Sequence, residues 1–513
     1  MSEKKRFFIN TIAQIISFLV GLGITFFLTP FIVEKIGTDA YGFIGLASSF
    51  IGYVQLITTA LNSMAGRFIT ISYHKGDIES ARKYFSSVFF SNLIAIAILT
   101  ALSVAVIYKL EFIIAIPQNL MTDVKLLFSL SFFNFFISLL FNVYNVSTFI
   151  KNRLDLASIR IIVSEIIRCV LLFSLFFYFA PAVYYIGIVA IVCSIYIIIT
   201  NIHFRNVLAP DLFIRKQYFD TAKIKELLSA GIWNVISKIN GVLAHGLDLL
   251  IANLFIGATP MGIIAITRRI PTLMLTFYEK INAVYAPTWT KLYAQGNRTA
   301  FHRQLLQSIR FFGIITFIPL AILFVYCDWF YALWLPSQNA RELYILTIVA
   351  CIDLPFAMPL QPIYNVYPIV NKIKANSLLG LGIYSATFLC ILIGVLITDD
   401  LWVQLLIIAA TRACFNLLKS VTFLPLYGSY CAKINASLLY INTGKSLISF
   451  TILVSILFYI KSVQTSVSWA ILVANMCFAT IIGSIVGYFL ILNNEDKQIL
   501  SNSLKQILSR LKR

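Results

Sequence analysis

The chain has 513 residues, of which 59% are hydrophobic and 12% are charged, with a net charge of +19 and a mean hydropathy of +0.88. This composition excludes a soluble globular protein, because a bilayer core takes about 20 apolar residues per helix and the chain offers such runs almost end to end. The runs are continuous and do not alternate with period two, so they predict an all-α integral membrane protein and not a barrel.

Uncharged or nearly uncharged runs predict about 14 transmembrane helices. The first run follows Lys4, Lys5 and Arg6 and is too long for the apolar part of a cleavable signal peptide, so we expect it to be retained. The thirteenth has only 15 charge-free residues, which leaves a count of 12 open. The predicted spans cover 7–33, 41–66, 84–108, 126–150, 156–180, 182–202, 229–254, 257–286, 308–335, 343–370, 376–397, 401–426, 441–460 and 467–492.

An internal repeat relates the two halves of the chain. A shift of 220 positions places Gly37 on Gly257, Gly42 on Gly262 and Gly76 on Gly296 in one ungapped register. The repeat predicts two pseudo-symmetric six-helix lobes of the same membrane orientation, followed by a C-terminal helix pair. The expected segments are an N-terminal lobe (1–202), a cytoplasmic interfacial linker (203–228), a C-terminal lobe (229–426), the additional helix pair (427–492) and a basic amphipathic cytoplasmic tail (493–513).

The basic residues of the loops predict the orientation. Lys and Arg gather in alternate loops and in both tails, which the positive-inside rule assigns to the cytoplasm. These residues lie beside anionic lipid headgroups, which we expect as partners, and they account for most of the net charge without a nucleic acid. The predicted protein is a multi-pass membrane protein with both termini cytoplasmic.

Ionisable residues inside the predicted spans are the main functional signal. A charge at the centre of a bilayer costs about 2.5–3.5 kcal/mol, so such residues face a wet cavity or a partner. Basic residues exceed the acidic ones, which predicts a cavity that attracts an anion. The central basic residues, expected to bind substrate, are Lys238, Arg268, Arg269, Arg412 and Arg168, and those nearer the cytoplasm, expected to snorkel, are Arg160, Lys280, Arg310 and Lys419.

Acidic residues lie near some of these predicted substrate-binding cations and offer other roles for them. Glu165 lies three residues before Arg168 and could simply pair with it. Asp248 lies three residues after His245, so Asp248, Glu165 and His245 are candidates for coupling transport to an ion or proton. A static role for Asp248 as a counter-ion to Arg268 or Lys238 is an equal alternative.

The stretch 231–296 concentrates these charges. It carries Lys238, His245, Asp248, Arg268, Arg269, Glu279 and Lys280 within two membrane-length segments. The 220-residue register places them on Phe18, Thr25, Leu28, Ser48, Ser49, Thr59 and Ala60 of the first lobe. Because the first lobe builds the same pair of spans without charge, we interpret the charges as a functional specialisation.

Prolines interrupt the tenth predicted span. Pro355, Pro359, Pro362 and Pro368 exclude a regular helix there, and such breaks are common in helices that move, so Pro355, Pro359 and Pro362 are candidates for gating. The sequence contains no phosphate loop, nucleophile elbow or metal-ligand cluster. We therefore predict neither a cofactor nor a metal, and not an enzyme.

The first three spans resemble a known family. Pro30, EKIGTDAYG (34–42), Asn62, Arg67 and YHKGD (73–77) are similar to the opening of the polysaccharide-transporter branch of the multidrug/oligosaccharidyl-lipid/polysaccharide superfamily, best matched by the O-antigen repeat-unit flippases. The resemblance implies ion-coupled alternating access that moves an undecaprenyl-pyrophosphate-linked oligosaccharide from the inner to the outer leaflet of a bacterial cytoplasmic membrane. It also implies, as partners, the polymerase and chain-length proteins of such a pathway.

Two other functions stay open at this point. A multidrug antiporter of the same superfamily would share the lobes, but export of cationic drugs favours an acidic cavity. A membrane enzyme such as a polysaccharide polymerase would be expected to have a large outer loop, which the sequence lacks.

Overall fold

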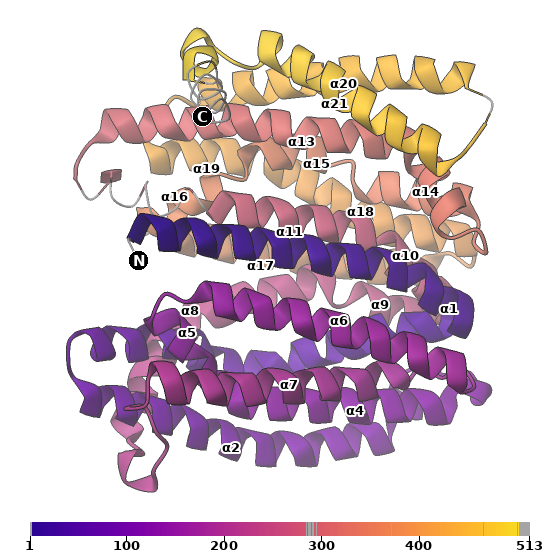
Figure 1. Cartoon of the computed structure of the whole chain (residues 1–513). Coiled ribbons are helices and arrows are strands. Elements are labelled where there is room, and N and C mark those ends of the chain that lie inside the picture. The colour runs from indigo at the N-terminus through magenta and orange to yellow at the C-terminus, as the bar shows by residue number, and fades with distance from the viewer. Residues whose placement is uncertain are drawn as a thin grey trace. The chain divides into compact units, whose positions relative to one another are not determined.

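The computed structural model describes residues 3–283, 285, 289, 292, 293, 295–370, 372–464, 466–499 and 501. These residues form helices and connecting loops, and no strand occurs among them, as the sequence predicts. The helices fall into two compact units, Met1–Ala265 and Ile266–Arg513, coloured from indigo to pink and from pink to yellow in Figure 1.

The first unit is built from long apolar helices joined by short turns. Its helices are α1 (Glu3–His74), α2 (Ile78–Tyr108), α3 (Leu110–Ile113), α4 (Met121–Phe141), α5 (Val146–Ile150), α6 (Leu154–Tyr178), α7 (Tyr185–Leu208), α8 (Thr221–His245), α9 (Asp248–Ile251) and α10 (Ala258–Thr267), which continues past Ala265. Short irregular turns are η1 (Gln118–Leu120), η2 (Asn142–Asn145), η3 (Lys216–Tyr218) and η4 (Ala252–Ile256).

The second unit is built around the long helix α13 (Arg298–Trp334). The last two helices of the unit pack against it. The elements are α11 (Arg269–Ala283), α13 (Arg298–Trp334), α14 (Ala340–Ala350), α15 (Leu354–Ala357), η5 (Met358–Leu360), α16 (Ile363–Ile369), α17 (Ile373–Ile397), α18 (Leu401–Val421), α19 (Phe423–Ala432), α20 (Ala436–Val463) and α21 (Trp469–Leu490).

The described residues contain fewer membrane-length helices than the fourteen predicted spans. Twelve helical stretches of the described residues are long and apolar enough to cross a membrane. One of them is α1, whose helical conformation breaks at Gly37 (φ 82°, ψ 166°), so its two arms form two spans. α10 and α11 lie outside the twelve because each is short, but together they cover the predicted eighth span. The predicted fourteen spans count the second arm of α1 as one further span and the pair α10 and α11 as another.

The backbone confirms the internal repeat. The glycines with positive φ in the described chain are Gly37, Gly76, Gly257 and Gly296, which are two pairs separated by 220 positions. Only glycine adopts this conformation without strain, so both halves break and turn the chain at equivalent places. The register therefore records a structural duplication.

The two copies differ in how continuous their helices are. α1 is helical on both sides of Gly37, whereas its counterpart is interrupted between α8 and α9 and again between α10 and α11. The seventh span nevertheless packs closely on α1, since a Cβ on Gly231 would lie 1.9 Å from the carbonyl oxygen of Ala60.

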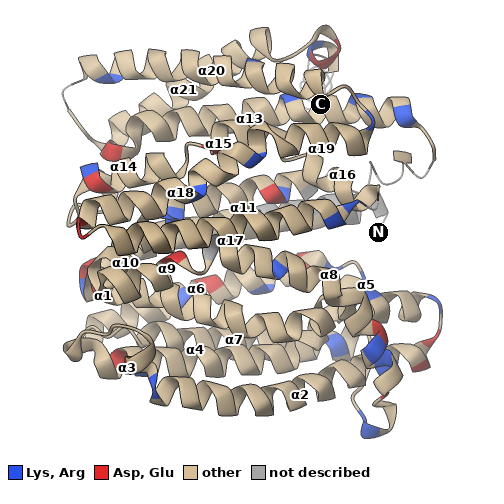
Figure 2. Ribbon diagram, turned by 180° about the vertical axis from the view of Figure 1, so that it is seen from behind, with Lys and Arg blue, Asp and Glu red and all other residues tan. Residues whose placement is uncertain are grey.

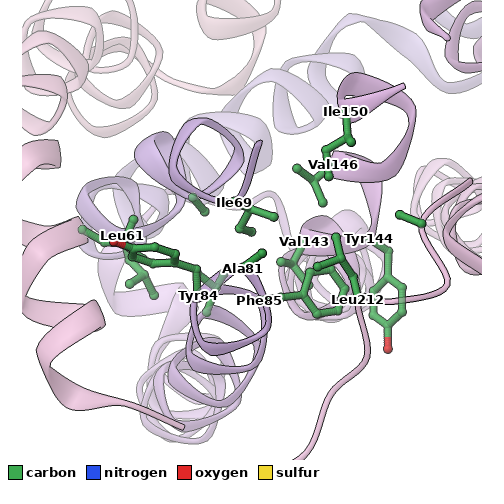
Figure 3. Close-up of a cluster of buried hydrophobic side chains, with 14 residues drawn as sticks. Leu61, Ile69, Ala81, Tyr84, Phe85, Val143, Tyr144, Val146, Ile150 and Leu212 are labelled. Atoms are coloured by element: carbon green, nitrogen blue, oxygen red, sulfur yellow. The ribbon is translucent and has the colours of Figure 1, made fainter. Parts of the chain in front are cut away.

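A buried hydrophobic cluster packs the segment between α7 and α8 against other helices of the first unit (Figure 3). Ala209, Leu212 and Leu227 are fully buried there, beside Phe85 and Tyr144. The sequence predicts an interfacial helix over this linker, and that prediction is wrong. α7 continues to Leu208, a loop with the short η3 follows, and α8 begins at Thr221.

Hydrogen bonds fix the same loop. The hydroxyl of Ser86 donates to the carbonyl of Phe213 (3.3 Å), and the hydroxyl of Ser87 accepts from the backbone N–H of Asp220 (2.9 Å). Asp220 caps α8 by accepting from the N–H of Ala222 at 2.8 Å. The apolar side chains of the linker are therefore core residues and not a membrane-surface face. Most of the predicted tail helix lies outside the described residues.

Candidate functional site

The interruptions of the second repeat carry charged residues. His245 is the last residue of α8 and Asp248 the first of α9, while Arg268 separates α10 from α11 and Arg269 begins α11. Interrupted membrane helices leave unpaired backbone N–H and C=O groups at their ends, and transporters use such ends to bind charged ligands. Four of the seven charges of the stretch 231–296 therefore mark the two breaks. The side chain of His245 lies outside the described residues.

The break between α8 and α9 is held by a tyrosine of α1. The hydroxyl of Tyr53 donates to the carbonyl oxygen of Gly246, which the end of α8 would otherwise leave unbonded. Gly246 suits this contact, because a Cβ there would lie 3.0 Å from the Tyr53 ring. Asp248 follows two residues later and is only 4% exposed. Its carboxylate is thus placed inside the first unit.

The remaining candidates of the first unit divide into one pair and one unpaired cation. Arg168 and Glu165 form an ion pair of 2.5 Å on α6, which is the alternative that their spacing left open. Lys238 is half-buried on α8 and forms no ion pair with any residue that the structure describes. Lys238 is therefore better suited than Arg168 to meet an anion.

A cluster of ionisable residues, two of them buried and three half-buried, lies in the second unit. It consists of Asp353 at the start of α15, Tyr364 on α16, Tyr384 on α17, and Arg412 and Lys419 on α18, and we refer to it as the second-unit cluster. Figure 2 shows basic positions part-way along α18, between helices that are otherwise uncharged over long stretches.

The geometry of the cluster follows from helix spacing and burial. Arg412 and Lys419 are seven residues apart and so share one face of α18. Asp353 is 5% exposed and interacts electrostatically with Arg412. The ammonium of Lys419, 7% exposed, lies 5.5 Å from the ring centroid of Tyr364 and 5.7 Å from that of Tyr384. Arg412 thus interacts with the carboxylate, and Lys419 lies over the two aromatic rings.

Proline positions the acidic member of this cluster. The tenth predicted span is divided into α14, α15, η5 and α16, so the prediction of an irregular helix is confirmed. Pro355 lies in the first turn of α15, Pro359 in η5, and Pro362 at the N-cap of α16. Each begins a new short turn, where its missing N–H costs no hydrogen bond. A gating role for these prolines remains a prediction.

The snorkelling prediction is wrong for three of its four residues. Arg160 is 6% exposed and donates to Asn145 at 3.1 Å and to Asn201. Arg310 is 9% exposed and pairs with Asp496 at 2.5 Å, and Lys419 belongs to the second-unit cluster. Polar partners from neighbouring helices satisfy these cations, which window hydropathy does not register. Lys280 is exposed.

Sequence analysis did not assign Asp353, Tyr364 or Tyr384 to a site. Asp353 carried one available signal, because it lies two residues before the first proline of the broken span. The sequence contains no signal that singles out Tyr364 or Tyr384, since aromatic residues are frequent throughout the chain. Arg269 is exposed and forms no ion pair with any described residue, while Arg268 is half-buried.

Comparisons with known proteins agree with this architecture. No family model matches the chain. Over 428 residues it is 27% identical to EpsK of Bacillus subtilis (strain 168), an uncharacterized membrane protein, and the match covers 83% of each chain. It is similar in structure to the lipid II flippase MurJ in an inward closed conformation, with a TM-score of 0.67, 14% identity, and coverage of 93% of this chain and 98% of MurJ.

A second solved structure shares the fold. An inward-facing multidrug resistance transporter of the MATE family, from the MOP superfamily, matches with a TM-score of 0.66 and 14% identity over 81% of this chain and 94% of the transporter. The chain is therefore a multi-pass membrane protein with the fold of MATE and MurJ transporters.

Proposed function

We propose that this protein is a flippase that moves an undecaprenyl-pyrophosphate-linked oligosaccharide from the inner to the outer leaflet of a bacterial cytoplasmic membrane. The fold is that of transporters which include the lipid II flippase MurJ. The residues 34–42 and 73–77 resemble the opening of the polysaccharide-transporter branch. Together they support a lipid-linked and carbohydrate-bearing substrate.

The observation that carries the proposal is the set of cations at and near the interrupted helices. Lys238 and Arg269 form no ion pair among the described residues, Arg268 lies at the break between α10 and α11, and Arg412 interacts with Asp353 at the start of α15. Cations without local carboxylates in a membrane protein are stabilised when an anion enters. A pyrophosphate, with several oxygens to accept charge-assisted hydrogen bonds, fits this requirement.

Transport would proceed by alternating access, which is common in transporters built from repeats. The polyprenyl tail stays in the lipid, because no protein group needs to replace its apolar surroundings. Asp248, Glu165 and His245 are the proposed ion-coupling residues, and Asp353 joins them because it is buried and interacts with Arg412. Protonation of a buried carboxylate would change how strongly neighbouring cations hold the substrate.

The leaflet distribution of the substrate tests the function. In cells that lack the protein, single lipid-linked repeat units should accumulate where only a cytoplasmic probe reaches them. Accumulation of unpolymerised units on the outer face would instead indicate a polymerase. Normal glycan together with sensitivity to cationic drugs would indicate a multidrug antiporter.

A further inference from the structure

A pocket of about 720 Å³, lined by both polar and apolar side chains, lies within the first unit between α1, α2, η2 and α5. We propose that this pocket, here the asparagine pocket, binds a phosphorylated sugar, and that it receives the headgroup of the lipid-linked oligosaccharide; the second part rests on the proposed function. None of its lining residues is acidic. Its polar groups come from Asn62, Ser63, Arg67, Thr70, Asn142 and Asn145.

The 3₁₀ geometry of η2 aims two asparagines at the pocket. Residues three apart eclipse each other in a 3₁₀ helix, so Asn142 aligns with Asn145 and Val143 with Val146. The valines are 4% and 7% exposed and belong to the buried cluster of Figure 3. The asparagines are exposed, and all four residues line the pocket. A regular α-helix would not stack the two amides in this way.

A buried arginine supports one of these amides. The guanidinium of Arg160 donates to the side-chain oxygen of Asn145 at 3.1 Å and also to Asn201. The bond orients Asn145 and leaves its NH₂ group for an acceptor on a ligand. No carboxylate pairs with Arg160 within the described residues, so its charge adds to the positive potential of the pocket.

A pair of amides fixes the opposite wall. Asn62 and Asn92 exchange two hydrogen bonds, of 2.9 and 3.0 Å, and Asn92 also donates to the carbonyl of Leu139 at 3.1 Å. Asn92 is fully buried, so this network joins α1, α2 and α4. Asn62 also donates to the carbonyl of Thr58 at 3.0 Å, so the network holds Asn62 in one orientation and leaves its side-chain oxygen as the group that can accept from a ligand.

Two further groups of α1 have no partner in the described chain. The hydroxyl of Thr70 is buried without a hydrogen bond, although buried polar atoms are normally satisfied. Arg67 is exposed and forms neither an ion pair nor a hydrogen bond with any described residue. A ligand that accepts from the guanidinium and bonds the hydroxyl would satisfy both.

The chemistry of the walls selects the ligand class. Amides and hydroxyls bind sugar hydroxyl groups in both hydrogen-bonding directions, and a guanidinium binds a phosphate through two parallel hydrogen bonds. The volume lies within the range of small-molecule sites, about 300–1,000 Å³. Asn62 lies twelve residues before the end of α1, about 18 Å along the helix axis. The pocket therefore extends inward from the predicted cytoplasmic surface, where the headgroup starts.

Binding to the purified full-length protein tests the pocket. The probes are N-acetylglucosamine 1-phosphate, undecaprenyl phosphate without sugar, and undecaprenyl-pyrophosphoryl-N-acetylglucosamine. Asn142→Ala should weaken both sugar-bearing probes about five- to tenfold and leave undecaprenyl phosphate unchanged. Arg67→Gln should weaken all three about tenfold.

Two further variants guard against misfolding and nonspecific effects. Asn145→Asp keeps a partner for Arg160 and places a carboxylate in the pocket, so it should repel every probe while the protein keeps its thermal stability. Asn119→Ala, an exposed asparagine of η1 outside the pocket, should bind all probes as the unchanged protein does.

Binding and flipping together separate the two proposals. If the unchanged protein flips the lipid-linked sugar and the pocket variants bind as tightly as it does, the pocket is overturned and the flippase stands. If the variants lose the soluble sugar phosphate but the unchanged protein flips nothing, the pocket stands and the flippase falls. Loss of affinity by Asn142→Ala for undecaprenyl phosphate equal to that for the sugar probes would overturn the assignment to a sugar.

Discussion

Gly42 and Gly262, which the internal repeat relates by 220 positions, contact each other in the structure. A Cβ on Gly42 would lie 3.0 Å from the backbone nitrogen of Gly262, and a Cβ on Gly262 would lie 2.3 Å from the carbonyl oxygen of Thr38. Small residues let membrane helices approach this closely. The equivalent glycines of the two copies thus form one shared helix contact inside the first unit.

This contact predicts the effect of one added methyl group. Gly262→Ala should lower the free energy of unfolding by about 1–3 kcal/mol, because the backbone of Thr38 cannot move aside cheaply. The matched control is Gly241→Ala on α8, where a Cβ meets nothing within 4 Å and alanine favours the helix. Thermal unfolding in detergent measures both. Equal melting temperatures for the two variants would show that the contact is looser than the structure indicates.

The second-unit cluster predicts a strong effect of neutralising its carboxylate. Asp353→Asn removes the buried carboxylate that interacts with Arg412, and removal of one member of a buried ionic group costs about 3–5 kcal/mol. We expect a lower melting temperature and loss of transport. Asp399→Asn, an exposed residue before α18, is the control and should change neither. Adding Arg412→Gln to Asp353→Asn should recover part of the lost stability, and no recovery would refute the pairing.

The unpaired cations predict a loss of function without a loss of stability. Lys238→Gln and Arg269→Gln remove donors to the anionic substrate, each worth about 1.5–3 kcal/mol, so flipping should slow roughly ten- to hundredfold. Their melting temperatures should not change, because neither side chain pairs with a described residue. Flipping in liposomes is the measurement, with the exposed Arg341→Gln of α14 as control. Normal rates in both variants would remove these residues from the substrate site.

The broken tenth span predicts a kinetic effect. Pro362→Ala supplies an N–H at the start of α16 and favours a helix continuous with η5, so transport should slow while substrate affinity stays constant. Pro336→Ala, in the exposed loop after α13, serves as control. The comparison needs both a turnover rate and a binding constant for each variant. A change in affinity with unchanged turnover would place Pro362 in binding and not in gating.

Hydropathy and glycine spacing predict much of the fold from the sequence. Long apolar runs correspond to the helices, and the 220-residue register corresponds to the paired positive-φ glycines Gly37 with Gly257 and Gly76 with Gly296. These features are local or periodic, and the sequence records them directly.

Side-chain environment was harder to predict, because it depends on contacts between distant segments. Depth alone suggested that Arg160 and Arg310 snorkel, but their partners Asn201 and Asp496 lie 41 and 186 positions away. The contact of Tyr384 with Lys419 could not be predicted for the same reason, because the two residues lie on different helices. The roles assigned to Lys238, Arg268, Arg269, Arg412, Arg168, Asp248, Glu165 and His245 remain predictions.

The docking of α8 on α1 has a consequence for how the protein is made. Gly231 packs against Ala60, and the preceding linker is buried against α2, so the first unit needs no residue beyond Ala265 for these contacts. Domains generally fold as units, in the order of synthesis. The first unit, including the break between α8 and α9, can thus assemble in the membrane while the ribosome is still translating the second.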